Sequence, residues 1–511
     1  MTQLALVIDL NVCVGCHACV TSCKQWNTSG TAGALADLNP YGADPNGTFF
    51  NRVQTFEVGE FPTTQTVHFP KSCLHCEDPP CVPVCPTGAS YKRAEDGIVL
   101  VDYDKCIGCS YCSWACPYGA RELDEARKVM TKCTLCVDRI YDTSIPPAQR
   151  KPSCVIACPS NARLFGDIHD PQSVVSRAIN DRAGYQLMPE WATQPSNHAH
   201  GHACGHAGGR KHRAQAAEHG LEGFGRGRVG GVGGVQRHVA HAQSARFGPG
   251  VGRNVARNHG LRAVALALAG AGLGASFFHL GRPERAWRAA TMWRTSWLSR
   301  EVIVLPLFML ALFAYGVAQF LGAGYSLLLG WLAVLLCLAL FVCTAMVYAS
   351  IRFLQEWASP LTLVNYLLLG CASGLTLATL LAASFGMMAL VTPYALAAAV
   401  LTLLAWVTRS ASLVRNARLS PKSTLQSAIG IKHPRIVQKA MGFMGGAFNM
   451  REFFHGRSAE LLRSVKWTFL LLVFPVPLLL LTVGVPSASL ALLFLAFAAQ
   501  YIGLLAERWY F

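Results

Sequence analysis

Cysteine spacing constrains this chain more than any other feature of its 511 residues. Sixteen of the 20 cysteines lie between Cys13 and Cys158, and they form four groups of four. The groups are Cys13, Cys16, Cys19 and Cys23; Cys73, Cys76, Cys81 and Cys85; Cys106, Cys109, Cys112 and Cys116; and Cys133, Cys136, Cys154 and Cys158. A proline follows the last cysteine of the second, third and fourth groups. This repetition indicates metal or redox chemistry rather than ordinary packing.

The first and third groups have the C-x2-C-x2-C-x3-C spacing, in which three cysteines of one loop bind three irons of a cubane cluster and a distant cysteine binds the fourth. Zinc and disulfides are the alternatives. Zinc sites commonly use two separated cysteine pairs, a pattern that only the fourth group resembles. No secretory signal is visible at the N-terminus, so we expect a reducing compartment, in which disulfides are rare. The spacing therefore predicts four iron–sulfur clusters.

Composition divides the chain into three zones. Residues 1–195 are loop-rich, and 1–190 hold 20 acidic against 16 basic residues. The junction at 196–260 is rich in glycine, histidine and arginine, whereas 261–511 contains apolar runs of membrane length. We expect about seven transmembrane helices there, near 261–280, 302–322, 327–350, 361–385, 388–408, 467–484 and 487–506. The basic excess lies between these runs, which indicates membrane topology and no nucleic-acid binding.

Basic residues are concentrated in alternate loops of the last zone. Loop 281–301 carries five arginines and loop 409–466 carries eleven Lys and Arg residues, whereas the connections near 323–326 and at 485–486 carry none. The positive-inside rule then predicts that 281–301, 351–360, 409–466 and the C-terminus face the cytoplasm. Seven spans would leave the N-terminal zone outside, although no export signal is visible. One additional span before residue 261 would remove this conflict.

The unusual segment 198–260 is where that additional span is expected. Our hypothesis is that this segment is translated out of frame or otherwise corrupted, because its bias is typical of a GC-rich gene read in the wrong frame. A histidine-rich metal-binding linker, with the stretch "HAHGHACGH", is the competing interpretation, and such a junction would be disordered. Resequencing the gene decides between the two, since an intact frame would refute corruption.

With these cysteine motifs, residues 1–190 resemble the four-cluster iron–sulfur subunits of molybdopterin oxidoreductases, the family of dimethyl sulfoxide, polysulfide and sulfite-oxidising complexes. The resemblance implies an α+β ferredoxin-like domain of the tandem bacterial two-cluster type with four [4Fe–4S] clusters. The ligand sets that it implies are Cys13, Cys16, Cys19 and Cys158; Cys23, Cys133, Cys136 and Cys154; Cys73, Cys76, Cys81 and Cys116; and Cys85, Cys106, Cys109 and Cys112. The wording "LNPYGADPNGTFFNRVQTFE" and "GYQLMPEWATQPSNH" is similar to the iron–sulfur subunit of cytoplasmic sulfite:quinone oxidoreductases.

The stretches "FFHLGRPERAWRA" (277–289) and "SWLSRE" (296–301) resemble the eight-helix anchor subunit of the same family, an all-α polytopic membrane bundle. The resemblance implies a quinone pocket lined by His279 and Glu301, with Arg282 and Arg300 nearby. Alternatively, His279 is a helix-end residue bonded to a neighbour and the arginines only set topology. His279 is the only histidine near a span, and a b-type haem usually needs two axial histidines, so no haem is expected.

The resemblance implies an electron-transfer and membrane-anchor component rather than a catalytic one. We expect it to pass electrons between a separate molybdenum catalytic subunit, which would carry the molybdopterin and oxidise sulfite, and the quinone pool. The alternatives are electron flow from quinol to a dimethyl sulfoxide or polysulfide reductase, and a membrane ferredoxin serving another acceptor. The expected location is the bacterial inner membrane, with the iron–sulfur domain on the cytoplasmic side.

Overall fold

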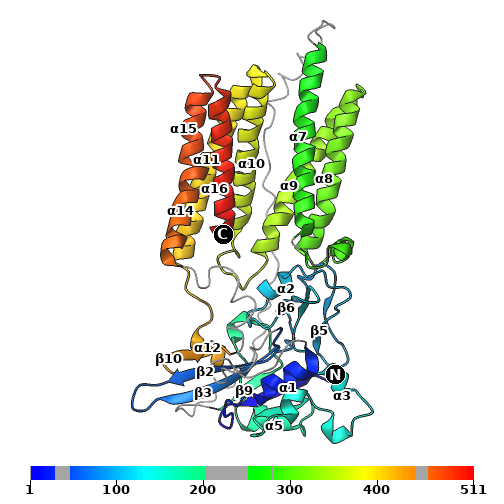
Figure 1. The fold of residues 1–511 in the computed structure, drawn as a ribbon, viewed down its shortest axis with the longest axis vertical. Helices are drawn as coiled ribbons and strands as arrows, with labels where there is room; N and C mark the ends of the chain where they lie inside the picture. Colours follow the sequence, from blue (N-terminus) through cyan, green and yellow to red (C-terminus); the bar gives the residue numbers. More distant parts are fainter. Residues whose placement is uncertain (1, 29–46, 202–250, 279, 443–457, 511) are drawn as a thin grey trace, which may run out of the picture.

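A computed structural model describes residues 2–28, 47–201, 251–278, 280–442 and 458–510 of the chain. His279 and residues 202–250, which make up most of the segment in our out-of-frame hypothesis, lie outside the described residues. The described chain forms a mixed α+β domain from its N-terminal part and a set of long helices from its C-terminal part (Figure 1). This is the fold class expected from the sequence.

The central sheet of the N-terminal domain is closed by segments from both of its ends. Strand β1 (Leu4–Asp9) pairs antiparallel with β8 (Arg163–Asp167) and parallel with β9 (His198–His200). Its sequence LALVID is buried at five of six positions, because sheet neighbours and the helix α5 (Val174–Asp181) cover it. The isoleucine and leucine side chains of β1 therefore hold the beginning and the end of this domain together.

Short elements carry the cysteine loops between these strands. The helices are α1 (Ala18–Asn27), α2 (Tyr111–Trp114), α3 (Val137–Ile140) and α4 (Ser153–Ile156), with 3-10 turns at Pro147–Gln149 and Pro189–Trp191. The hairpins are β4 (Ser90–Lys92) with β5 (Val99–Val101), and β6 (Glu122–Asp124) with β7 (Val129–Thr131). Residues with positive φ, namely His17, Ser110 and Cys136, precede α1, α2 and α3. Such backbone is costly for these residue types and is typical of functional loops.

A second three-stranded sheet joins the two parts of the molecule. Strand β2 (Arg52–Val58) pairs antiparallel with β3 (Gln65–Lys71) on one side. On its other side it pairs with β10 (Ile436–Ala440), which comes from the long basic loop of the C-terminal part together with the short helix α12 (Leu425–Ile429). Loop 409–466 therefore contributes a strand to the N-terminal domain.

Long apolar helices make up the C-terminal part. They are α7 (Val251–Phe278), α8 (Trp297–Phe320), α9 (Ser326–Ala349), α10 (Pro360–Ser384), α11 (Met388–Ala417), α14 (Ala459–Val473) with α15 (Pro475–Gly484), and α16 (Leu490–Tyr510), while Pro283–Ala290 (η4) is a 3-10 helix. Six of the described helical segments are long and apolar enough to cross a membrane, α14 and α15 counting as one. Helix α7 contains a shorter apolar stretch, Val264–Ala275.

Packing in the helical part is typical of membrane proteins. Small residues such as Ala382, Ala398 and Ala496 are fully buried between helices, whereas large apolar side chains such as Leu338 and Phe313 are 41% and 56% exposed. Lipid solvates such outward-facing side chains as well as a protein interior does, so close backbone packing through small residues holds the helices together. The chain is therefore a multi-pass membrane protein.

Candidate functional site

All nineteen cysteines in the described part of the chain are free thiols. Of the sixteen in the four groups, twelve are buried, Cys13, Cys109 and Cys158 are half-buried, and Cys16 is exposed. Burial raises the pKa of the Cys23 thiol well above its ordinary value, and the nearby Cys133, Cys154 and Cys136 raise it further. Several buried thiolates in one place need positive charge to be stable, and iron supplies it when bound.

Electrostatic interactions link cysteines within the sets that the resemblance implies, and the ligand sets themselves stay a prediction. Burial is the largest cause of each raised thiol pKa, and neighbouring thiols of the same set follow among the causes. Cys13 interacts with Cys19 and Cys158, Cys23 with Cys133, Cys136 and Cys154, Cys76 with Cys73, Cys81 and Cys116, and Cys109 with Cys85, Cys106 and Cys112. Cys16 lies on the same loop as Cys13. We number these sets 1 to 4 in the order given.

Set 4 surrounds a cavity. Its four cysteines, Cys85, Cys106, Cys109 and Cys112, line one small cavity together with Arg121. Four thiols and a cation are the donor set that suits a [4Fe–4S] cluster, because its irons take four thiolate ligands and the whole carries net negative charge.

Hydrogen-bond donors point at the sulfur atoms. The backbone N–H of Ser90 donates to Cys85 Sγ (3.4 Å), and those of Gly108 and Met130 both donate to Cys106 Sγ (3.4 Å each). The backbone N–H of Ser153 donates to Cys136 Sγ (3.5 Å), and that of Ala162 donates to Cys158 Sγ (3.3 Å). Asn27 Nδ2 donates to Cys136 Sγ at 3.4 Å. Hydrogen bonds to cluster sulfurs are one of the means by which a protein sets the reduction potential of a cluster.

Two buried arginines that sequence reasoning missed supply positive charge. Arg121 Nη2 donates to Cys81 Sγ at 2.8 Å, and Arg163 Nη1 donates to Cys154 Sγ at 3.5 Å. Burial alone would lower the pKa of Arg163, but the thiols of Cys19, Cys154, Cys23 and Cys133 together outweigh burial and raise it. A repeat in the sequence could have found both arginines: CPYGAR ends at Arg121 and CPSNAR ends at Arg163.

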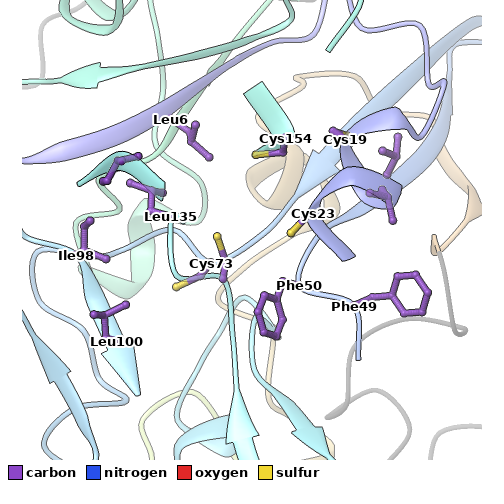
Figure 2. Packing of buried hydrophobic residues seen from close by; sticks show 14 residues of the cluster. Leu6, Cys19, Cys23, Phe49, Phe50, Cys73, Ile98, Leu100, Leu135 and Cys154 are labelled. Carbon is purple, nitrogen blue, oxygen red and sulfur yellow. The ribbon is translucent and has the colours of Figure 1, made fainter. Parts of the chain in front are cut away.

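The four sets follow one another along the domain. Between sets, electrostatic interactions link Cys19 with Cys154, Cys133 with Cys73, and Cys112 with Cys81. Figure 2 shows part of this line: Cys154 lies beside Cys19, Cys23 lies next to them, and Cys73 lies beyond Cys23. The order along the domain is therefore set 1, set 2, set 3 and set 4.

The anchor contacts the loops of set 4 through one segment. We call residues 281–299 the docking loop. Its Arg282 N–H donates to Ile107 O at 3.0 Å, and Ser296 and Ser299 donate to the carbonyls of Val84 (2.9 Å) and Pro86 (3.0 Å). Gly281 packs against Gly108, and a Cβ on either glycine would collide with Lys128 O. The docking loop thus contacts two loops of set 4: one carries Cys85, and the other carries Cys106 and Cys109.

The described residues expected around a quinone make contacts with different parts of the molecule. His279 lies outside the described residues. Arg282 Nε donates to Arg127 O at 2.8 Å, so this arginine contacts the N-terminal domain. Arg300 donates to the carbonyls of Trp293 (2.9 Å) and Arg294 (2.8 Å), which stabilises the docking loop. Glu301 accepts from Thr344 Oγ1 at 2.7 Å and interacts electrostatically with Arg508 at the end of α16.

Sequence reasoning also missed the second contact between the two parts. We call residues 425–440 the docking segment. Its Ile429 and Ile431 are 2% and 1% exposed and pack into the core beneath β2 and β3. Tyr185 donates to Ile429 O at 2.7 Å, and Arg435 and Lys439 form ion pairs with Glu60 (2.6 Å) and Glu57 (2.8 Å). In the sequence, the only indication of this strand was the short alternation of apolar and polar residues in "IVQKA", and the loop that contains it was interpreted from its charge alone.

These features define a class: an iron–sulfur electron-transfer domain joined to a polytopic helical membrane anchor. Residues 253–508 match the family described as the DMSO reductase anchor subunit, and residues 12–89 and 64–168 match two families of 4Fe-4S dicluster domain. The chain therefore belongs to the dimethyl sulfoxide reductase family, with its iron–sulfur and anchor subunits in one polypeptide. The expected family, fold class and role in electron transfer and membrane anchoring are confirmed.

Relatives match the two parts separately. The N-terminal part is similar to one sulfite dehydrogenase subunit of Allochromatium vinosum, with 78% identity over 198 residues, which cover 39% of this chain and 82% of that protein. The C-terminal part is similar to another sulfite dehydrogenase subunit of the same organism, with 56% identity over 261 residues, covering 48% of this chain and 80% of that protein. The N-terminal part is also similar to the iron–sulfur subunit of a putative dimethyl sulfoxide reductase of Halobacterium salinarum. The identity is 37% over 228 residues, which cover 39% of this chain and 79% of that protein.

Proposed function

We propose that this chain passes electrons from a sulfite-oxidising molybdenum subunit to the quinone pool. One observation carries the proposal: the two parts of the chain are similar to two different sulfite dehydrogenase subunits of one organism, at 78% and 56% identity. The catalytic chemistry belongs to a separate subunit that carries the molybdopterin, and this chain supplies the electron path and the membrane anchor.

Four [4Fe–4S] clusters held by sets 1 to 4 form that path. A bound cluster supplies reversible one-electron chemistry. The cysteines bind iron, the backbone N–H groups donate to their sulfurs, and Arg121 and Arg163 offset negative charge near Cys81 and Cys154. Together these residues keep water and other ligands away from most of the sulfur atoms, because twelve of the sixteen thiols are buried.

The two ends of the line of sets suit different partners. Set 4 lies against the docking loop and therefore faces the quinone side. Set 1 lies at the other end, where Cys16 is exposed and the neighbouring Val12 and Val14 are 42% and 63% exposed. Exposed apolar side chains beside a redox centre fit a surface that a partner protein covers. We propose that the molybdenum subunit binds there.

The iron–sulfur domain faces the cytoplasm in this proposal. The basic loops, including the docking loop and the docking segment, contact the iron–sulfur domain, so all of them lie on one side of the helices (Figure 1). By the positive-inside rule that side is the cytoplasmic side of a bacterial inner membrane. A sulfite-oxidising partner would then be cytoplasmic too.

Quinone exchange takes place at the anchor without a haem. Glu301 remains a candidate for the quinone site; it lies near the start of α8 and accepts a hydrogen bond from Thr344 near the end of α9. His279, from the same predicted pocket, is the other candidate, since an imidazole titrates near neutral pH and can transfer one of the two protons of quinol chemistry. Arg282 and Arg300 support this site indirectly, through the docking loop.

Purification from membranes tests the function. We expect a brown complex that contains a co-purifying molybdenum subunit, about sixteen iron and sixteen acid-labile sulfide per chain by the four-cluster assignment, and sulfite-dependent reduction of a quinone analogue. A colourless, iron-free preparation would disprove the cluster assignment. A preparation with iron but without molybdenum would favour a membrane ferredoxin.

The second candidate function is a reductase that takes electrons from quinol. The observation that favours it is the 37% identity to the iron–sulfur subunit of a putative dimethyl sulfoxide reductase and to a tetrathionate reductase subunit of Salmonella typhimurium. Quinol-dependent reduction of dimethyl sulfoxide, polysulfide or tetrathionate by the purified complex, with no sulfite oxidation, would select this candidate.

A further inference from the structure

The residue before the second cysteine has the same kind of backbone conformation in all four cysteine groups. Its φ is +68° at Gly15, +46° at His75, +68° at Gly108 and +56° at Leu135. Glycine adopts this left-handed region freely, whereas residues with a side chain are uncommon there. The loop of set 3 therefore carries a histidine where the loops of sets 1 and 4 have glycine and that of set 2 has leucine, so the turn itself does not require the imidazole.

The His75 side chain is buried with one of its nitrogen atoms unpaired. His75 is 0% exposed. The backbone N–H of Val99 in β5 donates to His75 Nδ1 at 3.1 Å, so Nδ1 is an acceptor and carries no hydrogen. The neutral imidazole then has its one N–H group at Nε2. Among the described residues, Nε2 has no hydrogen-bond partner. Buried N–H groups without an acceptor are costly and rare, so this donor needs an acceptor.

The charged neighbours of His75 are donors as well. Electrostatic interactions link His75 with Arg121 and Lys132. Arg121 Nη2 donates to Cys81 Sγ of set 3 at 2.8 Å, whereas its Nη1 is buried with no partner in the described part of the chain. Lys132 Nζ donates to Cys133 O at 2.6 Å. Arginine and lysine side chains accept no hydrogen bonds, so neither can pair with Nε2. Two unpaired donors, on His75 and Arg121, thus belong to the surroundings of set 3.

Sulfur atoms at set 3 are the acceptors that fit these donors. His75 stands between Cys73 and Cys76, and all four cysteines of set 3 are buried. A bound [4Fe–4S] cluster adds inorganic sulfide to these thiolates and gives the site net negative charge. Hydrogen bonds in which the acceptor is charged are stronger than those between neutral groups. The buried N–H group of His75 therefore suits the loaded state of this site.

We propose that His75 Nε2–H donates a hydrogen bond to a sulfur atom of the cluster at set 3 and thereby raises the reduction potential of that cluster. This inference rests on the proposed function, in which set 3 holds one of the four clusters. A donor stabilises the reduced cluster, which is more negative, more than the oxidised one. One electron leaves the reduced cluster of set 2 and reduces the cluster of set 3, and the imidazole keeps its proton. A higher potential at set 3 favours this step toward the anchor.

Exchange of His75 for asparagine tests the hydrogen bond. Asparagine tolerates positive φ, and its Oδ1 can accept from the Val99 N–H, but its side chain is too short to place a donor where Nε2 lies. The full chain with its clusters is titrated with dithionite and followed by EPR. In His75→Asn, reduction of one cluster should become about tenfold less favourable, which lowers its one-electron midpoint potential by about 59 mV. The potentials of the other clusters should stay unchanged.

Two further variants separate the hydrogen bond from a structural role. His169→Asn is the matched control, because His169 is an exposed histidine of the same domain that does not flank a cluster cysteine, and it should leave every potential unchanged. His75→Gln has a longer amide that can place an N–H group near the position of Nε2, so it should recover part of the lost potential. A potential in His75→Gln as low as that of His75→Asn would overturn the inference.

The outcomes distinguish this inference from the proposed function. Unchanged potentials in His75→Asn, with the iron content of the wild type, would overturn the inference alone. An equal shift of every cluster would also overturn it, because a single hydrogen bond acts on one cluster. A wild-type chain without iron would overturn the proposed function and this inference with it.

A second measurement uses the wild-type chain and stays decisive if His75→Asn loses iron. The chain is labelled with ¹⁵N-histidine, and its reduced clusters are measured by pulsed EPR. A ¹⁵N coupling should appear and should persist in His17→Asn, which removes the histidine next to Cys16 of set 1. Absence of a ¹⁵N coupling, or its loss in His17→Asn, would overturn the inference. Coupling to exchangeable deuterons alone would assign the contact to a buried water and would overturn it too.

Discussion

The two halves of the chain bury different kinds of side chain. The iron–sulfur domain buries twelve of its cluster-group thiols with charged residues such as Lys24, Arg121 and Arg163, each 2% exposed or less. The anchor buries many alanines, serines and threonines and exposes many of its leucines and some of its phenylalanines. A thiol-rich, charged interior is stable when iron supplies the missing positive charge, whereas the helices need lipid around them. Metal should therefore determine the stability of one half and hardly affect the other.

Loss of one cluster is the most severe way to test this contrast. Cys133→Ser removes a buried ligand of set 2 and should lower the iron content by about a quarter, because a four-cluster domain would lose one cluster. The 1–200 region should become sensitive to protease while the helical circular dichroism of the anchor persists. Cys337→Ser in α9 is the control and should leave the iron content unchanged, since Cys337 lies in a membrane helix. Unchanged iron in Cys133→Ser would contradict the ligand assignment.

The one buried ion pair described inside the anchor provides the converse test, in which the anchor is destabilised and the iron–sulfur domain should be unaffected. Arg409 and Glu507 are 2% and 7% exposed and lie 2.7 Å apart. Arg409→Met leaves the carboxylate of Glu507 buried without its partner and should destabilise the anchor by about 3–5 kcal/mol. Thermal unfolding of the helices measures the loss, and the iron content should not change. The double variant Arg409→Met/Glu507→Gln should recover much of the stability, and no recovery would mean that packing rather than charge is responsible.

Local spacing explains what could be predicted from the sequence. A cluster loop takes three ligands from seven residues, so the sequence spacing of Cys106, Cys109 and Cys112 is enough to predict that they bind a cluster. Membrane spans are equally local, because length and hydropathy define them. Contacts between distant segments have no such signal. The pairing of β10 with β2 joins residues almost 400 positions apart, and the direction in which Arg121 and Arg163 point depends on the folded domain.

The junction shows the limit of local reasoning. Gly201 belongs to the iron–sulfur domain. Helix α7 is 28 residues long; its last residue, Phe278, lies beside that domain, and its first residue lies at the end of the helices that is distant from the domain (Figure 1). At about 1.5 Å per residue, Val251 lies roughly 40 Å away, on the opposite side of the helices. The sequence of 202–250, which lies outside the described residues, contains no apolar run of membrane length. This geometry agrees with our hypothesis of a lost helix, which resequencing tests.

Crowding the docking loop should weaken the contact between the halves without harming either. Gly281→Ala places a methyl group against Lys128 O and next to Gly108, and overpacking of this kind costs about 1–3 kcal/mol. The rate of electron transfer from dithionite-reduced clusters to a quinone analogue should fall, with iron content and helix stability unchanged. Gly272→Ala on α7, where an added Cβ has no neighbour within 4 Å, is the matched control. An unaffected rate in Gly281→Ala would show that the docking loop does not position set 4.

The exposed ion pairs of the docking segment should have the smallest effect. Arg435 with Glu60 and Lys439 with Glu57 are all more than 40% exposed, so water and salt screen them and each pair contributes about 0.2–1 kcal/mol. The double variant Arg435→Gln/Lys439→Gln should lower the unfolding temperature of the iron–sulfur domain only slightly, and less at high salt. Ile431→Ser, which puts a hydroxyl into the core beneath β2, should cost more, because burial rather than charge holds this segment. If the charge variant were the more damaging one, the segment would be held by electrostatics, and the contact between the halves would weaken as ionic strength rises.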